Sequence, residues 1–566
     1  MTEKIWLKHY PPGVPGEINP HAYESVADLF EQSCAKFSHK PAISNFGVQL
    51  SYSQLEQASR HFAAYLQQVL ALKKGDRLAI MLPNLLQYYV TMFAALRIGL
   101  IVVNVNPLYT VTELIHQLND AQVTGIVVMA NFADTVAKAL PQTQLKHVIV
   151  TELGDLFGFF KSHIANFIVR HIKKLVPSYY LPQSIAFKQA LNEGRKHNFQ
   201  KIILQATDVA YLQYTGGTTG IPKAAVLTHA NMIANVEQAY HWVISSNLCE
   251  GEEIVMVPLP LYHVFSLTVS TLCFLKMGGL AVLITNPKDL DNFIKQLTRI
   301  PYTVFIGINT LLNALLHRED FKKLSFQHLK LAVAGGMPLQ KTVADEWYRI
   351  TGKYVLEGYG LTEASPIVTI NPTDVNRFTG SIGLPVPSTD VTIRDDAGND
   401  LAIGMEGEIC VKGPQVMREY WHNEAETQQV LTADGWLKTG DLGRFDDEGF
   451  LYLLDRKKEM ILVSGFKVFP SEVEDVIMKI AAVAEVAVTS MPSETTGEAV
   501  KAFVVRKAGV QLSEEEIIQH CHESLTRYKV PKLVEFVDSL PKSAVGKVLR
   551  RELQQKNNSD QGNVHA

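Results

Sequence analysis

The stretch Tyr214-Thr-Gly-Gly-Thr-Thr-Gly-Ile-Pro-Lys223 contains three glycines, three threonines and a lysine, directly after the apolar run Val209-Ala-Tyr-Leu-Gln213. Glycines let backbone N–H groups approach a polyanion, and consecutive N–H groups form an anion-binding concavity. A flexible hairpin without a ligand is the alternative. The length of the string favours a phosphate-binding loop. The loop is not a Walker A loop, because Gly-x4-Gly-Lys-Ser/Thr does not occur in it.

Length and composition describe an ordinary globular enzyme with more than one domain. The chain has 566 residues, 47% of them hydrophobic and 19% charged, and single cores stop growing at roughly 250–300 residues. The formal net charge of −4 gives no basic surface for nucleic acid. The five cysteines never occur as Cys-x-x-Cys, which argues against a disulfide framework or a zinc site and favours a reducing cytosol. They are Cys34, Cys249, Cys273, Cys410 and Cys521.

Membrane-spanning and export segments are not expected. The N-terminal residues lack the apolar run of a signal peptide. Charged residues interrupt the longest apolar stretches, as Arg97 and Lys276 do, so no segment reaches the ~20 apolar residues that a spanning helix needs. We expect a protein that is soluble or lies on a membrane.

The order of apolar runs predicts an α/β fold with two parts. Helix-like stretches alternate with near-continuous apolar strands in the first two thirds of the chain, which is typical of doubly wound parallel sheets. Short strands and tight turns between about 376 and 455 indicate a small antiparallel β unit. A compact α+β stretch of roughly a hundred residues follows Asp455. The clearest predictions are helices at Leu55–Val69, Leu86–Arg97 and Val111–Asp120, and strands beginning at Arg77, Leu100, Thr124, Ile254, Ala281, Thr303 and Leu331.

The segment Leu156–Val176 stands apart. It places Phe160, Ile164, Phe167, Ile168, Ile172 and Leu175 at helical spacing, interrupted by Lys161, Arg170, Lys173 and Lys174. A basic amphipathic helix can lie in a membrane interface. The alternatives are a helix that packs on the core or on a second subunit.

Five motifs in a fixed order give the chain a family resemblance. The motifs are the loop at 214–223, Glu357-Gly-Tyr-Gly-Leu-Thr-Glu363, Thr439-Gly-Asp441, Asp455-Arg-Lys-Lys-Glu-Met-Ile-Leu-Val-Ser-Gly-Phe-Lys467 and Pro541-Lys-Ser-Ala-Val-Gly-Lys547. Together they resemble the adenylate-forming enzymes, which include acyl-CoA synthetases, peptide-synthetase adenylation domains and luciferases. The resemblance covers nearly the whole chain. It is closer to bacterial long-chain fatty acyl-CoA synthetases in Val103–Tyr109, the 214–220 loop, Ser381–Ser388 and Tyr528–Phe536.

The resemblance implies that a carboxylate attacks the α-phosphate of ATP, giving an acyl adenylate and pyrophosphate, before CoA takes the acyl group. Glu363 would be the Mg²⁺ ligand, since this cation commonly takes one or two carboxylates, and Thr362 would contact the α-phosphate. ATP and CoA would be co-substrates, and a fatty acid the acyl donor. The phosphates would be bound by Tyr214, Thr215, Gly216, Gly217, Thr218, Thr219, Gly220, Ile221, Pro222, Lys223, Ala224 and Ala225.

The resemblance also assigns the nucleoside and the acyl site. Gly335, Gly336 and Gly358 would leave room for adenine, on which Tyr359 would stack. Asp441 would accept hydrogen bonds from the ribose hydroxyls, with Arg456 as a second ribose contact. Leu259–His263 matches one wall of the acyl site, where His263 orients the carboxylate, gates the pocket or is merely a buried, hydrogen-bonded histidine.

The C-terminal part would serve both half-reactions. Lys547 would stabilise charge at the α-phosphate during adenylation. Rotation about a hinge at 455–458, with Lys458 at its centre, would then bring the Ser464–Lys467 loop to the site. Ser464, Gly465 and Lys467 would line the CoA channel. The expected domains are residues 1–454 and 459–566. One departure is Ala224, where the family often has glycine.

Several alternatives stay open on the sequence. They are a fatty acyl-AMP ligase that delivers to an acyl carrier protein, a medium-chain or aromatic acyl-CoA ligase, and an inactive binding module. Retention of Glu363, Asp441, Arg456 and Lys547 opposes the last. The resemblance makes a homodimer plausible. We expect a cytoplasmic location, with peripheral contact to the inner face of the cell membrane as a further expectation.

Overall fold

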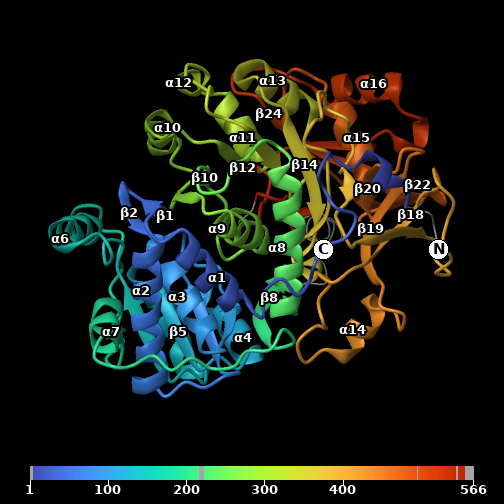
Figure 1. Cartoon of the computed structure of the whole chain (residues 1–566). Coiled ribbons are helices and arrows are strands. Elements are labelled where there is room, and N and C mark those ends of the chain that lie inside the picture. The colour runs from blue at the N-terminus through green and yellow to red at the C-terminus, as the bar shows by residue number, and fades with distance from the viewer. Residues whose placement is uncertain (1–3, 216–221, 494, 544–545, 555–566) are drawn as a thin grey trace. The chain divides into compact units, whose positions relative to one another are not determined.

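The computed structural model describes residues 4–215, 222–493, 495–543 and 546–554 (Figure 1). It divides into two compact units. The large unit comprises residues 6–390 and 412–437, and the small unit comprises 391–411 and 438 onward together with the first residues of the chain. The predicted α/β class is confirmed in both units, which are described separately below.

A nine-stranded sheet forms the first half of the large unit, in the order β16-β15-β14-β13-β12-β10-β11-β1-β2. The strands from β14 to β1 in this order pair in parallel, whereas β2, β15 and β16 add antiparallel edges. Buried strands without polar alternation, such as Leu331–Ala334, explain why parallel pairing was predicted. The strands are β1 (Pro41–Asn45), β2 (Val48–Ser51), β10 (Ile254–Val257), β11 (Leu280–Leu283), β12 (Val304–Gly307), β13 (Leu331–Ala334), β14 (Val355–Gly360), β15 (Ile367–Ile370) and β16 (Leu384–Pro385).

A seven-stranded sheet forms the second half, in the order β7-β6-β5-β3-β4-β8-β9. Its pairs are parallel except for β8 with β9. The chain therefore reverses direction between β8 and β9, at the glycine-rich loop. The strands are β3 (Arg77–Met81), β4 (Ile101–Asn104), β5 (Gly125–Met129), β6 (His147–Thr151), β7 (Ile185–Ala186), β8 (Val209–Thr215) and β9 (Lys223–Thr228).

Helices cover these sheets, and two predicted helices have the expected bounds, α3 (Leu86–Arg97) and α4 (Val111–Asp120). Every residue of α3 is buried, and Arg97 at its end pairs with Glu31 and Glu56. Among the residues that the structure describes, none of the helices is long and apolar enough to cross a bilayer. The others are α1 (Val26–Lys36), α2 (Tyr52–Ala64), α5 (Ala133–Ala139), α6 (Phe159–Phe167), α7 (Phe187–Gly194), α8 (His229–Ile244), α9 (Phe274–Lys276), α10 (Leu290–Arg299), α11 (Asn309–Leu316), α12 (Glu319–Lys322), α13 (Lys341–Thr351) and α14 (Glu424–Val430), with π-helical turns at η2 (Tyr65–Val69), η5 (Ile168–Ile172) and η6 (Ser266–Cys273).

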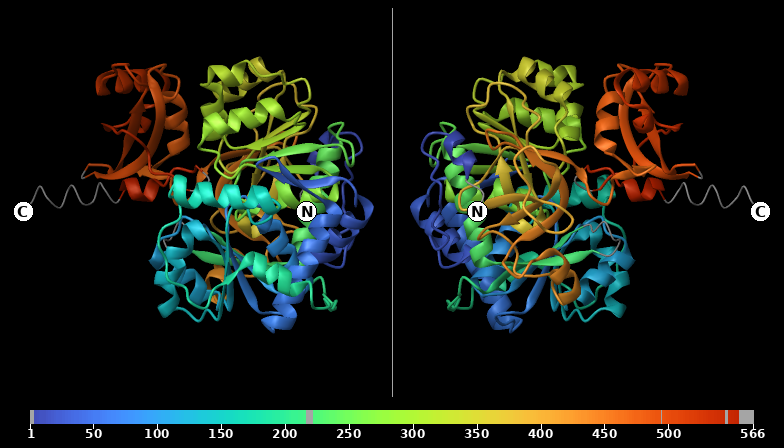
Figure 2. Two further views of the ribbon diagram at one scale, coloured as in Figure 1. Left: turned by 90° about the vertical axis from the view of Figure 1, so that its left-hand side faces the viewer. Right: turned by 90° about the vertical axis from the view of Figure 1, so that its right-hand side faces the viewer.

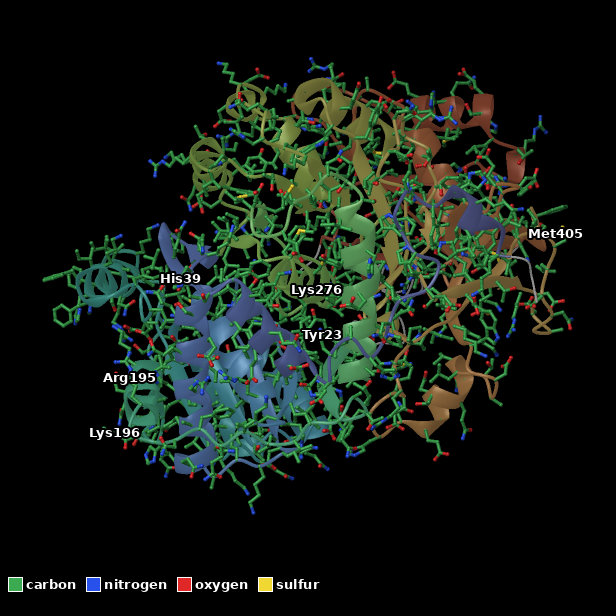
Figure 3. The ribbon with its side chains drawn as sticks, viewed as in Figure 1. Tyr23, His39, Arg195, Lys196, Lys276 and Met405 are labelled. Carbon is green, nitrogen blue, oxygen red and sulfur yellow. The ribbon has the colours of Figure 1, made fainter. Side chains whose placement is uncertain are left out.

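Lys276, which interrupts an apolar run in the sequence, is neutralised where α9 ends. Its ammonium pairs with Glu237 of α8 and lies 4.1 Å from the ring centroid of Tyr240 and 5.6 Å from that of Tyr23. Figure 3 shows Tyr23 and Lys276 close together. A charge in an apolar run is thus accommodated by a carboxylate and two aromatic faces.

The small unit contains two further sheets. A four-stranded sheet has the order β17-β18-β19-β20, and a second sheet has the order β22-β21-β24-β23 with β25 beside β24. The compact small unit includes β17–β20 as well as the C-terminal residues. The predicted hinge at 455–458 is a statement about motion, and it stays a prediction. The elements are β17 (Asp390–Arg394), β18 (Gly407–Lys412), β19 (Leu437–Phe445), β20 (Leu451–Arg456), β21 (Ile461–Val463), β22 (Phe466–Val468), β23 (Val483–Ser493), β24 (Gly497–Arg506), β25 (Leu533–Phe536), α15 (Pro470–Ile477) and α16 (Glu514–Ser524).

Gly383 marks a close backbone crossing in the large unit. Its φ is +97°, and a Cβ built on it would lie 2.0 Å from the carbonyl carbon of Ile370 and 2.3 Å from the amide nitrogen of Asn371. Gly383→Ala should therefore lower the free energy of unfolding by about 3 kcal/mol or more. The loss is measured as a lower thermal midpoint. The matched control is Gly75→Ala, because Gly75 has φ +89° and open space around it. That control carries only the ~1–2 kcal/mol cost of positive φ. Equal midpoints for the two variants would contradict the steric argument.

Candidate functional site

The two arms of the glycine-rich loop form an antiparallel hairpin. Thr215 at the end of β8 is in register with Lys223 at the start of β9, and Tyr214 with Ala224. Pro222 precedes β9, and Ala225 follows Ala224 within it. The predicted phosphate contacts Gly216, Gly217, Thr218, Thr219, Gly220 and Ile221 lie outside the described residues. The hairpin therefore fixes both ends of the loop within one strand pair.

Lys223 and Glu363 are connected through one aromatic side chain, Tyr420. The Tyr420 hydroxyl donates to Glu363 Oε1 at 2.6 Å, and the Lys223 ammonium lies 5.5 Å from the Tyr420 ring centroid. Lys223 also pairs with Glu426 of α14. Tyr420 itself forms a β-bridge with Ala225, so the segment that orients Glu363 is attached to the hairpin. Sequence analysis found neither Tyr420 nor Glu426.

Glu363 and Thr362 begin a short 3₁₀ turn, η7 (Thr362–Ala364). The Met417 amide donates to the Glu363 carbonyl at 2.7 Å, which fixes the backbone as Tyr420 fixes the side chain. One carboxylate oxygen of Glu363 thus accepts a defined hydrogen bond. Among the described residues no cluster of three or more His, Cys, Asp or Glu side chains could hold a metal. Mg²⁺ commonly takes one or two carboxylates and substrate phosphates, and a single oriented carboxylate fits that chemistry.

The three glycines assigned to the adenine site lie at the ends of β13 and β14. A Cβ on Gly335 would lie 3.1 Å from the Gly358 carbonyl and 3.3 Å from the Phe265 ring. Gly336 has φ +77°. Tyr359 follows Gly358 within β14. A side chain at Gly335 would be crowded by Gly358 and Phe265. The two predicted glycine motifs therefore lie beside the segment after His263.

Three buried polar residues fix the segment Leu259–His263. Asn84 accepts from the Leu261 amide at 2.9 Å, the Tyr88 hydroxyl donates to the Leu261 carbonyl at 2.9 Å, and Gln213 donates to the Tyr262 carbonyl at 2.7 Å. Gln213 immediately precedes Tyr214, so β8 positions both the phosphate loop and the predicted acyl-site wall. These three residues belong to none of the motifs described above.

His263 is a neutral group in this setting. Burial lowers the pKa of His263 to about 4. Its Nδ1 accepts a hydrogen bond from the Phe265 amide at 3.3 Å, so the proton of the neutral ring lies on Nε2. His263 can therefore donate one hydrogen bond to a carboxylate or a carbonyl, and it does not act as a cation near pH 7.

In the small unit, Asp441 and Arg456 face each other across two strands. They are in register between β19 and β20, with Arg456 Nε 3.2 Å from Asp441 Oδ1. Asp441 is buried, at 4% exposure. Lys458 lies two residues beyond Arg456 and is exposed. The structure thus brings together the two predicted ribose contacts.

Lys547 lies on a tight hairpin of the small unit. The Ser543 amide donates to the Lys547 carbonyl at 2.8 Å, and the Lys547 amide donates to the Ser543 hydroxyl at 3.1 Å. Burial, followed by the charge of Arg456, lowers the pKa of Lys547 to about 8, against the opposing influence of Glu459 and Asp441. Lys547 is therefore close enough to the Asp441–Arg456 pair to sense both charges.

The predicted CoA-channel loop is an exposed turn between β21 and β22. Ser464 has φ +50° and Gly465 φ +84°, and the two neighbouring strands pair antiparallel with Val463 opposite Phe466. No atom within 4 Å would meet a Cβ on Gly465. Lys467 lies in β22 and is exposed. The turn leaves its Gly465 face open.

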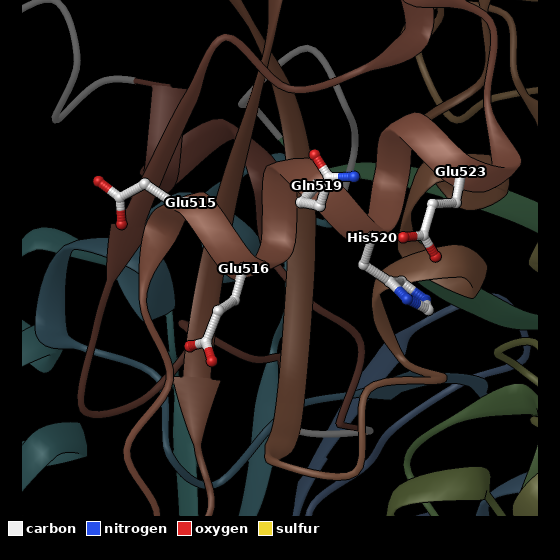
Figure 4. A pocket seen from close by; sticks show the side chains of 5 residues that line it. All are labelled: Glu515, Glu516, Gln519, His520 and Glu523. Atoms are coloured by element: carbon white, nitrogen blue, oxygen red, sulfur yellow. The ribbon is translucent and has the colours of Figure 1, made fainter.

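A separate hollow of about 390 Å³ lies on α16. Figure 4 shows its lining side chains, which come from one helix and include three carboxylates. None of the predicted site residues is among them; the lining residues are Glu515, Glu516, Gln519, His520 and Glu523. An acidic surface on a single helix offers no groups for phosphate binding.

Comparisons with known proteins agree with this geometry. The AMP-binding enzyme model matches residues 30–421, and the AMP-binding enzyme C-terminal domain model matches residues 472–547. A long-chain-fatty-acid–CoA ligase of Yersinia pestis is 53% identical over 551 residues, covering 97% of this chain and 98% of that protein. One of Bacillus subtilis is 37% identical over 556 residues, covering 98% of each. The ATP-bound crystal structure of MatB from Rhodopseudomonas palustris has a TM-score of 0.80 at 28% identity, over 94% of this chain and 98% of that one. The chain belongs to the AMP-binding enzyme family.

Proposed function

We propose that this protein is an ATP-dependent ligase that joins long-chain fatty acids to CoA through an acyl adenylate. The observation that carries the proposal is the connected set of contacts in the large unit. Gln213 links β8 to the His263 segment, and Tyr420 links β9 to Glu363. A phosphate loop, an oriented carboxylate and a neutral hydrogen-bond donor thus share one framework. The long-chain substrate follows from the names of relatives that match nearly the whole chain.

In the first step a fatty-acid carboxylate oxygen forms a bond to the α-phosphorus, and the bond to the departing pyrophosphate breaks. Repulsion between the carboxylate and the phosphates must be neutralised before these atoms meet. The loop amides and Lys223 would hold the β- and γ-phosphates. Lys547 would stabilise charge at the α-phosphate, and His263 would donate its Nε2 proton in a hydrogen bond to the carboxylate.

Glu363 would hold Mg²⁺, which supplies positive charge for the phosphate oxygens. The Tyr420 hydrogen bond leaves Glu363 Oε2 for a cation. Asp441 and Arg456 would bind the ribose, since an ionised carboxylate accepts from two hydroxyls.

In the second step the CoA sulfur bonds to the acyl carbon, AMP leaves with the electrons of the broken C–O bond, and the thiol proton is lost. Lys547 has no role in this step. We propose that the C-terminal part rotates about the 455–458 hinge between the steps. The open face of Gly465 would then admit the thiol arm, because a glycine there adds no side chain to the channel.

We also propose peripheral contact with an anionic membrane through α6 and η5. Six large apolar side chains there are 54–79% exposed: Phe159, Phe160, Ile164, Phe167, Ile172 and Leu175. Water-exposed rings on one helix are costly unless something covers them. In Figures 1 and 2 this helix lies at the surface of the large unit, in front in the left view of Figure 2. Contact between copies of the chain, as a homodimer, is the competing prediction for this surface.

Charge favours lipid as the covering partner. No Asp or Glu occurs between Asp155 and Glu193, a stretch that carries five basic residues in a chain with more acidic than basic residues. Lys161, Lys173 and Lys174 are exposed beside the apolar side chains. Basic residues flanking buried rings are typical of helices at anionic interfaces.

The substrate proposal is tested by pyrophosphate release across a series of acids. With ATP, Mg²⁺ and CoA, palmitate and oleate should give higher kcat/KM than acetate or benzoate. Lys547→Ala should lower the release by ~10²–10³-fold, the usual cost of losing one electrostatic donor. A preference for acetate or benzoate would contradict the chain-length proposal. If pyrophosphate release turned over without CoA, and the acyl group passed to an acyl carrier protein, the enzyme would instead be an acyl-AMP ligase.

Tyr420→Phe should raise the Mg²⁺ concentration that half-saturates adenylation by about tenfold or more. Loss of one hydrogen bond to a charged group costs roughly 1.5 kcal/mol or more, which frees the Glu363 carboxylate to rotate. The aromatic ring beside Lys223 is retained. Tyr452→Phe, in β20 of the small unit, is a matched control and should leave the Mg²⁺ dependence unchanged. An unchanged Mg²⁺ requirement for Tyr420→Phe would remove Tyr420 from the metal site.

Reversing both charges at Lys173 and Lys174 to Glu should weaken sedimentation with vesicles that contain phosphatidylglycerol. Each basic residue near an anionic surface contributes about 1 kcal/mol, so we expect at least a tenfold lower partition coefficient. Phe160→Ser should weaken binding to the same vesicles, because it removes an apolar side chain that would enter the lipid. The control is Lys322→Glu with Lys323→Glu at the C-terminal end of α12, an adjacent pair with the same charge change. Equal effects of both pairs, or a shift in oligomeric state instead, would contradict a lipid-binding α6.

A further inference from the structure

Arg550, close to Lys547 in sequence, binds two carboxylates at once. Its guanidinium contacts both oxygens of Glu474, with Nη2 at 2.8 Å from Oε1 and from Oε2, and Nε at 3.2 Å from Oε1. Its Nη1 pairs with Glu459. A planar guanidinium that meets one carboxylate through two nitrogens fixes geometry as well as charge.

The two carboxylates belong to different parts of the small unit. Glu474 lies in α15 and also accepts from the Val488 amide of β23 at 2.7 Å. Glu459 follows β20, one residue after the proposed hinge, and its amide donates to the Arg456 carbonyl at 2.9 Å. Arg550 therefore joins the end of the chain to α15 and to the hinge region.

The position of Arg550 relative to Lys547 is fixed by a short hairpin. Lys542 forms a β-bridge with Val548, and the Leu549 amide donates to the Pro541 carbonyl at 2.9 Å. Arg550 follows directly and begins a helical segment whose Leu553 is buried against Phe503. Only two residues separate Lys547 from Arg550, so a movement of the guanidinium shifts the hairpin on which Lys547 lies.

Arg550 and its two carboxylate partners are ion-paired and mostly buried. Its side chain and those of Glu459 and Glu474 are 17–20% exposed. Burial raises the pKa of Glu474 to about 7, and Arg550 opposes this by favouring the ionised form. Burial also raises the pKa of the nearby Asp455, again against the influence of Arg550. The guanidinium thus offsets several carboxyl groups that would otherwise repel one another.

We propose that Arg550 is a positioning residue for Lys547, which it holds in the adenylating position by binding Glu474 and Glu459 together. The inference rests on the proposed function, in which Lys547 serves adenylation alone. A displacement of about 1 Å at a reacting group can cost ~10²-fold in rate. Loss of Arg550 therefore impairs the first half-reaction and spares the second.

The test compares Arg550→Met, Arg550→Lys and the adjacent control Arg551→Met in the full-length protein. Arg551 is exposed and carries the same formal charge. Adenylation is measured as pyrophosphate release from palmitate and ATP without CoA, in a single turnover. The second half-reaction is measured as loss of free thiol from supplied palmitoyl adenylate and CoA.

Arg550→Met should lower the adenylation rate by about 10–100-fold with less than a twofold change in the KM for ATP. Thioester formation should stay within twofold of the unmodified protein. Arg550→Lys should recover part of the rate, because the charge remains while the two-nitrogen contact is lost. Arg551→Met should change neither half-reaction. Equal loss of both half-reactions, or full retention of adenylation, would overturn the inference.

Two further variants test the inference if Arg550→Met does not fold, and separate the role of Arg550 from that of Lys547. If Arg550→Met does not fold, Glu459→Gln removes one contact while Glu474 remains bound, and a smaller loss confined to adenylation is expected. Equal effects of Glu459→Gln on both steps would overturn the inference. Lys547→Ala is measured alongside. If it leaves adenylation intact, the proposed role of Lys547 fails; if it abolishes adenylation while Arg550→Met does not, only the role of Arg550 fails.

Discussion

Antiparallel pairing of β8 with β9 is the constraint on which the candidate site of the large unit depends. All other pairs of the seven-stranded sheet are parallel and need long crossover connections. An antiparallel pair can be joined by a short connection, and only residues 216–222 stand between β8 and β9. That short closure explains a glycine-rich sequence there. It also places Gln213 and Ala225 side by side in register, from which the contacts to Tyr262 and Tyr420 extend in two directions.

In the small unit the constraint is different: Lys547 must be held in place without being neutralised by a carboxylate. A carboxylate in direct contact with Lys547 would bind the ammonium and withdraw it from the substrate. The carboxylates are instead bound by other cations, Glu474 and Glu459 by Arg550 and Asp441 by Arg456. Burial, and next the charge of Arg456, lower the pKa of Lys547 to about 8. The lowered pKa means that the ammonium form is less stable than in water, which is the consequence of leaving this cation available for an anionic substrate.

The fold was largely predictable because its signals are local. Apolar runs such as Arg77–Met81 and the periodicity of Leu86–Arg97 determine strands and helices over a few residues, and both were predicted with the bounds that the structure shows. Glu363 and Asp441 were assigned from the family resemblance, which likewise rests on short stretches of sequence, and their roles stay predictions. Their partners were not predicted. Tyr420 lies 57 positions from Glu363, and Glu426 lies 203 positions from Lys223. A tyrosine or glutamate at such a separation carries no periodicity and no spacing that sequence alone could detect.

The acid-free stretch around α6 shows why overall charge is a poor guide to surface chemistry. The chain has a formal net charge of −4, which alone would predict repulsion from an anionic membrane. Without the five basic residues between Asp155 and Glu193, the rest of the chain would carry −9. Charges more than a Debye length apart, about 8 Å at physiological salt, are largely screened from one another. A membrane that approaches α6 therefore interacts with the local basic residues and the exposed rings, and the distant acidic residues contribute little. Attraction at the α6 surface would also orient the protein, because that surface combines positive charge with exposed apolar side chains.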